Sequence, residues 1–286
     1  MQYARIAIQA MILVFAAATS ATAQTAPAQE QPDAMGLLKN VELAYGAINT
    51  YSSKVTSTIT MDQSGAQGNV NMETPMTVTA DASGRFRIES KGMMGMMGMT
   101  LVYDGNAMWM YMEGANSYSK LPLNEGSASV RAGAMGGGMS GGAIGLDYKN
   151  VTSGVKEAKI LRSEKVHVND ADADCWVVSL TYEGPGAEAS SAMKSAGLSM
   201  DDFSRAKTLW VDKSRNLVYR EDSTTKMTLP NAHAPTTTKQ SSKVESFTVN
   251  DPVSPDVFTF TPPAGAKELD TSKFMPKNGQ APQTQN

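Results

Sequence analysis

The sequence has very little of the two residue types on which much catalytic and metal chemistry depends, cysteine and histidine. Its 286 residues include one cysteine, Cys175, and two histidines, His167 and His233. A single cysteine cannot form a disulfide within the chain, and this set is too small for a Cys/His zinc cluster. Neither histidine has serine and aspartate at a spacing that suggests a catalytic triad. The sequence therefore predicts no zinc site and no cofactor.

Charge of either sign is also scarce. There are 25 Lys and Arg residues against 28 Asp and Glu residues, a net charge of −3, and charged residues make up 19% of the chain. No run of basic residues occurs, which argues against a surface that follows a phosphate backbone. We therefore expect no nucleic-acid partner. The length and the 41% hydrophobic content suit one large domain with a substantial core.

Long apolar runs are absent except at the N-terminus. Residues 6–18 follow Arg5 and contain no charge, but Gln9 interrupts them. The run is shorter than the ~20 apolar residues that a membrane-spanning helix needs. Ala21-Thr22-Ala23 has the small-x-small pattern that signal peptidase cuts. We predict a cleavable signal peptide at residues 1–23 and export to the periplasm.

The rest of the chain divides into segments by composition. Residues 24–32 are rich in Ala, Pro and Gln and predict a disordered leader. Residues 33–269 form the predicted domain, which a flexible Gly- and Met-rich insertion interrupts at residues 124–146. Residues 270–286 predict a disordered tail.

The predicted domain begins with an amphipathic helix. Asp33 is a suitable N-cap, and the apolar residues after it recur every three or four positions. They are Leu37, Leu38, Val41, Ala44, Tyr45 and Ile48. This helix needs a surface on which to bury its apolar side.

After the helix, the hydrophobic period changes from 3.6 to 2, which indicates half-buried strands. Turn residues 104–106, Asp-Gly-Asn, indicate a tight hairpin. About ten strands are expected from these patterns. Their ranges are 54–61, 69–78, 85–89, 100–103, 107–112, 159–168, 175–183, 208–212, 217–224, 243–249 and 257–261. Turns are expected at 169–174 and 213–216.

Residues 188–206 have a helical composition, so a helical lid is expected within the series of strands. Its apolar side would carry Met193, Met200 and Phe203. No alternation of strand with helix suggests a parallel sheet. The expected fold class is α+β: an antiparallel, unclosed half-barrel that wraps around the N-terminal helix and the lid.

Four short motifs, in this order, resemble the LolA-like superfamily. They are SGRFRIE at 83–89, LWVD at 209–212, NLVYR at 216–220 and PDVFTFTPPAGA at 255–266. That superfamily includes the periplasmic lipoprotein carrier LolA, its outer-membrane receptor LolB and the RseB/MucB regulators. The resemblance implies a half-barrel whose apolar concave face holds the acyl chains of a lipid or lipoprotein beneath helices.

The resemblance and the strand alternation together give a set of candidate ligand-binding residues. Each buried CH₂ group of an acyl chain would contribute ~0.8 kcal/mol. The candidates are Val70, Met72, Met76, Val78, Met108, Trp109, Met110, Tyr111, Trp176, Val178 and Leu180. For any one of them, an ordinary place in a packed core is the competing interpretation.

Methionine is unusually abundant, with 20 residues in the chain. Unbranched thioethers form deformable apolar surfaces that can accommodate varied ligands. Clustered thioethers are also soft ligands for Cu(I), and Met108, Met110 and Met112 would project from one side of a strand. Copper binding is therefore a less favoured alternative to lipid binding.

The sequence predicts a non-enzymatic periplasmic protein that sequesters or carries a lipid or acyl chain. The alternative is a sensor of the RseB/MucB type, in which lipid occupancy changes contact with a membrane-protein partner. A hydrolase using Ser140 is a third hypothesis, because residues 138–142 fit G-x-S-x-G. Their low-complexity flanks lack the strand and helix that a nucleophile elbow requires.

Overall fold

The structure is a computed structural model. It describes residues 31–62, 70–91, 98–122, 148–182, 184, 199–228 and 236–269. The predicted signal peptide, most of the leader, the insertion at 124–146 and the tail at 270–286 lie outside these residues. The described residues from Pro32 onward form one compact unit.

Helix α1, Ala34–Gly46, starts where the sequence predicts it. The Asp33 carboxylate accepts a hydrogen bond from the Gly36 amide at 2.7 Å and so caps the helix. Leu38 and Val41 are fully buried, in agreement with the predicted apolar side. Among the described residues, no helix is long and apolar enough to cross a membrane.

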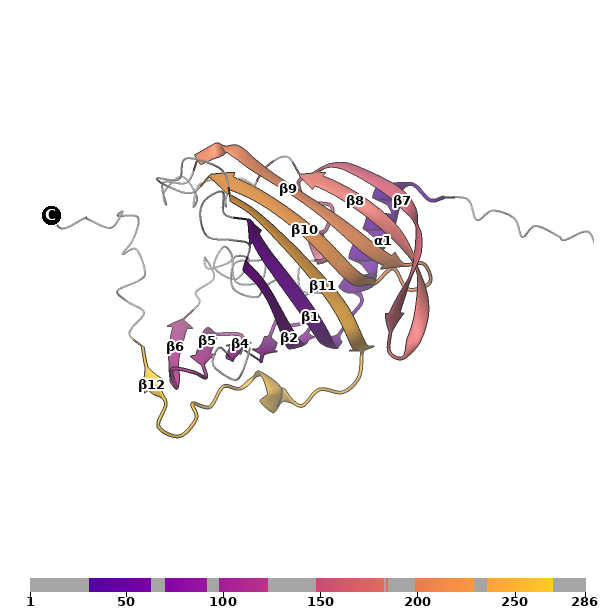
Figure 1. The fold of residues 1–286 in the computed structure, drawn as a ribbon. Helices are drawn as coiled ribbons and strands as arrows, with labels where there is room; N and C mark the ends of the chain where they lie inside the picture. Colours follow the sequence, from indigo (N-terminus) through magenta and orange to yellow (C-terminus); the bar gives the residue numbers. More distant parts are fainter. Residues whose placement is uncertain are drawn as a thin grey trace, which may run out of the picture. The chain divides into compact units, whose positions relative to one another are not determined.

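In the described part of the chain, twelve strands form one sheet, which does not close on itself (Figure 1). The strands are β1 (Thr50–Asp62), β2 (Val70–Asp81), β3 (Phe86–Ser90), β4 (Met99–Tyr103), β5 (Ala107–Met112), β6 (Ser117–Pro122), β7 (Val155–Val168), β8 (Ala171–Tyr182), β9 (Ser199–Asp212), β10 (Val218–Thr228), β11 (Thr236–Val249) and β12 (Lys267–Glu268). Two short 3-10 helices, η2 (Tyr148–Asn150) and η3 (Pro255–Phe258), complete the described elements.

The strand order shows how the chain builds this sheet: β12-β6-β5-β4-β3-β2-β1-β11-β10-β9-β8-β7. Two meanders, β1 to β6 and β7 to β11, are joined side by side where β1 pairs with β11. Every pairing is antiparallel except that of β12 with β6. The sheet is therefore largely antiparallel, as expected from the period-2 alternation.

The two edges of the sheet are protected in different ways. At one edge, β12 covers β6 with only two residues. At the other, β7 is long, but its pairing register shifts between Ile160 and Arg162, and exposed charged side chains such as Lys159 line it. Bulges and lysines are common protections of an edge strand against pairing with another chain.

Several sequence predictions need correction. Residues 199–206, expected as part of the helical lid, belong to β9, because their place between β8 and β10 provides backbone partners that outweigh a helical composition. Residues 188–198 lie outside the described residues. The strand expected at 257–261 is not formed, because η3, which begins at Pro255, occupies its start. Strands β6 and β12 were not predicted at all.

The turn expected at 169–174 is much shorter. β7 ends at Val168 and β8 begins at Ala171, so Asn169 and Asp170 alone connect them. Their φ angles are 51° and 59°, the left-handed conformation that a two-residue hairpin requires and that Asn and Asp tolerate. The acidic residues beyond them belong to the strand β8.

With one α-helix among the described residues, the fold is mostly β rather than the expected α+β. Helix α1 packs against η2 and β7, and Figure 1 shows it beside the β7–β10 half of the sheet. The Val218 amide donates a hydrogen bond to the Tyr45 hydroxyl at 3.2 Å, which fastens the helix to β10. This contact identifies the face of the sheet on which α1 lies, called the inner face below.

Candidate functional site

The inner face of the sheet is the candidate site, because its composition differs from that of the opposite, outer face. The pairing registers place odd-numbered β1 residues such as Val55 opposite even-numbered β2 residues such as Met76 on this face. On β1–β6 and β11, no inner-face position whose side chain is described carries a charged residue. An uncharged sheet face of this extent is suited to apolar contacts.

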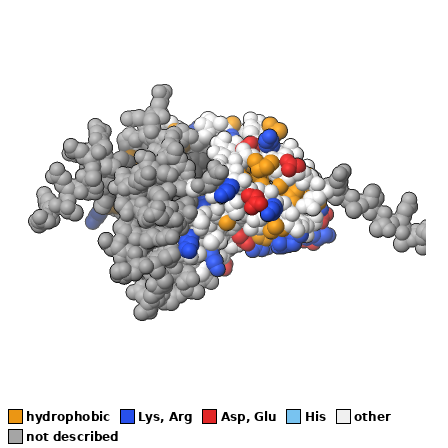
Figure 2. Space-filling view, turned by 90° about the horizontal axis from the view of Figure 1, so that it is seen from above, with side chains coloured by type: hydrophobic (Ala, Val, Ile, Leu, Met, Phe, Trp, Pro, Cys, Tyr) orange, Lys and Arg blue, Asp and Glu red, His pale blue; other side chains and the backbone are white. Residues whose placement is uncertain are grey.

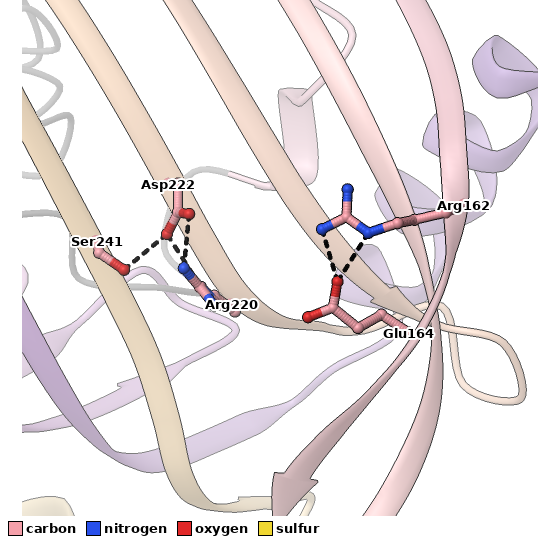
Figure 3. A network of polar contacts seen from close by, with 5 residues as sticks. All are labelled: Arg162, Glu164, Arg220, Asp222 and Ser241. Carbon is pink, nitrogen blue, oxygen red and sulfur yellow. Dashed lines mark hydrogen bonds and ion pairs between the residues drawn. The ribbon is translucent and has the colours of Figure 1, made fainter.

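The outer face carries most of the described charges of the sheet, and several of them are paired. Arg162 donates two hydrogen bonds to Glu164, at 3.0 and 2.6 Å. Arg220 donates two to Asp222, which also accepts one from Ser241 (Figure 3). The hydrogen bond from Arg162 lowers the pKa of Glu164. Viewed from above, the described surface mixes both signs of charge with small apolar patches (Figure 2).

Several predicted ligand-binding residues lie on the inner face and are buried in the core. Val78, Val178 and Leu180 are fully buried. Met76, Met108 and Trp176 are between 5% and 9% exposed. Their burial fits the competing interpretation, a packed core, at least as well as ligand contact.

The remaining inner-face candidates are more accessible. Met72 and Met110 are half-buried, and Met112, their neighbour along the face, is 38% exposed. Val70 lies in β2, but its side chain is outside the described residues. Methionine side chains, which repack easily around different ligands, therefore form part of the accessible inner face, together with half-buried neighbours such as Ile59 and Thr74.

Trp109 and Tyr111 lie on the outer face, since they alternate along β5 with Met108 and Met110. Their rings pack against Phe260, with centroid distances of 5.5 and 6.2 Å. The segment from η3 to β12 thus crosses the outer face of β3–β6. These two candidates have a structural role there, which period-2 alternation alone could not separate from ligand binding.

The Trp109 indole is also held at its polar end. Its Nε1 donates a hydrogen bond to the Asp104 carboxylate at 2.8 Å, and the amides of Asn106 and Ala107 donate to the same side chain. Burial acts to raise the pKa of Asp104, but these hydrogen bonds outweigh it and the net pKa is lowered. The predicted 104–106 turn is thereby confirmed and tied to the outer aromatic cluster.

The predicted lid residues are not brought together over the inner face by the described structure. Met200 and Phe203 lie in β9, where their side chains are outside the described residues. Met193 lies outside the described residues altogether, as do Ser140 and His233. Sequence patterning mistook residues 199–206, the start of a long strand, for part of a helix.

A buried ion pair on the inner face escaped sequence analysis. Lys207 of β9 and Glu221 of β10 approach to 2.9 Å, with side chains only 7% and 12% exposed. The Tyr148 hydroxyl of η2 donates to the other Glu221 oxygen at 2.6 Å. No sequence motif joins these three residues. Their contact arises from strand pairing and from the return of the chain to α1.

A second polar group lies beside this ion pair. Ser242, opposite Glu221 on β11, donates to Ser57 at 3.2 Å, and Gln240 donates to Ser57 at 3.1 Å. These side chains satisfy one another, as buried polar groups must. They separate the densely packed core beneath α1 from the far end of the inner face.

At that far end, Arg205 projects from β9 on the same side as Lys207. Its guanidinium lies over the Tyr182 ring, 4.7 Å from the centroid. Arg205 forms no ion pair with any carboxylate of the described residues. Lys207 is already paired with Glu221. Among the described residues of β9–β11, Arg205 is therefore the inner-face cation that has no anionic partner.

The remaining candidates for chemistry are a metal site, His167 and Cys175. No group of three or more His, Cys, Asp or Glu residues within the described part of the chain could hold a metal ion. His167 contacts Asp172 at 3.1 Å on an exposed hairpin. Cys175 is fully buried, and desolvation raises the pKa of its thiol to about 12, so the reactive thiolate is disfavoured.

The copper candidates Met108, Met110 and Met112 lie together on the inner face of β5. Met99 of β4 is directly opposite Met112 in the antiparallel ladder, a neighbour that the sequence analysis did not identify. The arrangement is compatible with thioether ligation, and copper binding stays a prediction.

No family model matches the chain, and no curated protein matches it. Several solved structures do match the chain. The LolA superfamily protein from Nitrosomonas europaea is 12% identical, with a TM-score of 0.35, over 80% of this chain and 99% of that one. An uncharacterized conserved protein from Thermus thermophilus is 12% identical, with a TM-score of 0.42, over 82% and 99%.

The MucA/MucB complex of Pseudomonas aeruginosa also matches. It is 11% identical, with a TM-score of 0.37, over 80% of this chain and 62% of that one. The solved structures that match this chain thus include a LolA superfamily protein and MucB.

Proposed function

We propose that this protein is an exported binding or carrier protein that holds a hydrophobic ligand, a lipid or acyl chain, on the inner face of its open sheet, without chemistry. The observation that carries the proposal is the absence of described charged side chains on the inner face of β1–β6 and β11, together with the accessible methionines Met72, Met110 and Met112. Burial of acyl CH₂ groups there would provide the binding free energy.

The methionines support a lipid better than a rigid ligand. A thioether side chain is unbranched and polarizable, so it can follow the shape of a flexible chain. Ile59, opposite Met72 on β1, adds a further half-buried apolar side chain. The export signal at residues 1–23 belongs to the same proposal, since it would place the protein in the periplasm.

Two variants that differ by one position test the proposal. Met72→Lys places a charge on the inner face, whereas Glu73→Lys places it on the outer face of the same strand. Binding of the apolar probe N-phenyl-1-naphthylamine to the purified chain is followed by fluorescence. We expect about a tenfold loss of affinity for Met72→Lys, because a lysine would have to be desolvated. Glu73→Lys should bind as the parent does.

Failure of the parent chain to bind the probe, or equal loss in both variants, would contradict the proposal. Thermal unfolding of both variants shows whether either has lost its fold. Native mass spectrometry of protein purified from an exporting host without detergent provides a second readout, the copurified lipid.

The partner hypothesis, a lipid-responsive regulator that contacts a membrane protein, depends on the same ligand. It predicts that a membrane protein is recovered with the lipid-loaded chain and not with the empty one. Recovery that does not change with lipid would contradict it.

Cu(I) binding is a second candidate function, favoured by the direct pairing of Met99 with Met112. The test is a Cu(I) titration in competition with a chromophoric chelator. Met99→Leu combined with Met112→Leu should weaken Cu(I) binding and leave probe binding intact, because leucine keeps the apolar surface. An unchanged Cu(I) affinity excludes this pair as ligands.

A further inference from the structure

The inner face carries few charges, and their distribution is uneven. The described side chains of β1–β6 and β11 contribute none, and β9 and β10 contribute Arg205, Lys207 and Glu221. Lys207 and Glu221 pair with each other at 2.9 Å. Over β1–β6 and β9–β11, Arg205 is therefore the described inner-face charge that has no opposite charge paired with it.

The surroundings of Arg205 hold its guanidinium in place without neutralising it. The Tyr182 ring lies beneath it, with 4.7 Å between the guanidinium carbon and the ring centroid. Such stacking occupies the flat side of the guanidinium and leaves its N–H donors at the edge available. Arg205 is half-buried, so an anion that it binds would be partly shielded from water.

Arginines on the outer face, unlike Arg205, are paired with carboxylates of this protein. Arg162, Arg220 and Arg87 each donate to a carboxylate two residues away on the same strand (Figure 3 shows the first two). At the equivalent spacing from Arg205 on β9, the residue toward the C-terminus is Lys207, a cation that is itself paired with Glu221. The site lacks an internal anion among the described residues and favours an external one.

We propose that Arg205 binds the anionic head group of the ligand, a carboxylate or a phosphate, so that the ligand is an amphiphile with one negatively charged end rather than a neutral lipid. This inference rests on the proposed function, since the inner face of the sheet must hold the chain. A guanidinium suits either head group because its fork of donors matches two oxygens.

The decisive comparison is between two ligands with the same chain. Oleate and oleyl alcohol differ in the charge of the head group, and each is titrated against bound N-phenyl-1-naphthylamine at pH 8. The parent chain should prefer oleate by about tenfold, the size expected for a charge-assisted hydrogen bond. Arg205→Gln should lose this preference and keep its affinity for oleyl alcohol.

Two further variants separate charge from structure. Arg205→Lys retains a cation and should retain part of the preference for oleate. Arg162→Gln removes an arginine from the outer face and should change neither affinity. Thermal unfolding of each variant confirms that the fold is retained. A comparison of oleate with 1-oleoyl lysophosphatidate then shows whether the carboxylate or the phosphate is bound more tightly.

The outcomes distinguish the two proposals. Equal affinity of the parent for oleate and oleyl alcohol, or a preference for oleate that persists in Arg205→Gln, overturns the head-group assignment and leaves lipid binding standing. If neither ligand displaces the probe and the probe itself does not bind, the proposed function fails as well.

Discussion

Asn169 and Phe247 are joined by a pair of hydrogen bonds between a side-chain amide and a strand backbone. Asn169 Nδ2 donates to the Phe247 carbonyl at 2.9 Å, and the Phe247 amide donates to Asn169 Oδ1 at 2.8 Å. The amide thus takes the place of a neighbouring strand and fastens the tip of the β7–β8 hairpin to β11. The residues are separated by 78 positions, so no local pattern indicates the contact.

The first prediction concerns this contact. Asn169→Gly keeps a residue suited to the φ of 51° and removes both side-chain hydrogen bonds. We expect the free energy of unfolding to fall by about 1–2 kcal/mol. Asn169→Ala should cost about 1 kcal/mol more, because alanine disfavours the left-handed conformation. Urea denaturation measures both, and equal stability of Asn169→Gly and the parent would show that the two bonds contribute nothing.

The second prediction concerns the segment that crosses the outer face. Phe258 is 2% exposed, and the Arg85 guanidinium lies 4.7 Å from its ring centroid. Phe258→Ala should lower the free energy of unfolding by about 3 kcal/mol, because it leaves a cavity in a buried aromatic contact. The adjacent exposed residue provides the control: Thr259→Ala should change stability by less than about 0.5 kcal/mol. Similar losses in both variants would mean that the segment is not anchored by this side chain.

The third prediction concerns the buried ion pair. Lys207→Met leaves Glu221 buried without its cation and should lower the free energy of unfolding by about 3–5 kcal/mol. The matched exposed pair is Arg162 and Glu164, with side chains 54% and 36% exposed. Arg162→Met should cost less than about 1 kcal/mol.

The double variant Lys207→Met with Glu221→Leu completes the test. It should recover most of the stability that Lys207→Met loses, since the unpaired charge is gone. A double variant as unstable as the single one would instead assign the loss to packing.

The fourth prediction is a pH dependence. The pKa of the folded Cys175 thiol is about 12, whereas an unfolded thiol has a pKa of about 8.5. The contribution of Cys175 to stability is complete below about pH 8.5 and falls as pH rises toward 12, since only the unfolded chain releases the proton. Stability should therefore decline more steeply between about pH 8.5 and pH 10 in the parent than in Cys175→Ala.

Desolvation also raises the pKa of Tyr51 and Tyr219. The parent and Cys175→Ala should therefore both lose some stability at high pH. Urea denaturation of the parent and of Cys175→Ala is measured over this pH range. The difference between the two sets of unfolding free energies gives the contribution of the thiol. Parallel series would show that Cys175 is not protonated more strongly in the folded chain.

Local sequence patterns are enough to specify the helix, most strands and the residues that share a face. The cap at Asp33 and the spacing of Leu38 and Val41 specify α1, because a helix repeats every 3.6 residues. Period-2 alternation likewise assigns Met76 and Val78 to one face of β2. Helix caps and hydrophobic periods are local properties, because they depend only on residues close together in the sequence.

Tertiary structure decided what each face contacts. Met110 and Tyr111 alternate as any strand residues do, but only the path of the chain after η3 puts Tyr111 against Phe260. Residues 199–206 have the composition of a helix, yet hydrogen bonds to β8 and β10 make them a strand. Long-range backbone pairing can therefore override local propensity and decide both whether a segment is a helix or a strand and where it ends.

The candidate site shows the same division. Uncharged alternation predicted an apolar face, and most of the residues named for it lie there. Lys207, Glu221 and Arg205 were not foreseen, because their roles depend on which strands are neighbours and on which side α1 lies. A charge inside a sheet is interpretable only once its partner, or the lack of one, is known from residues distant in the sequence.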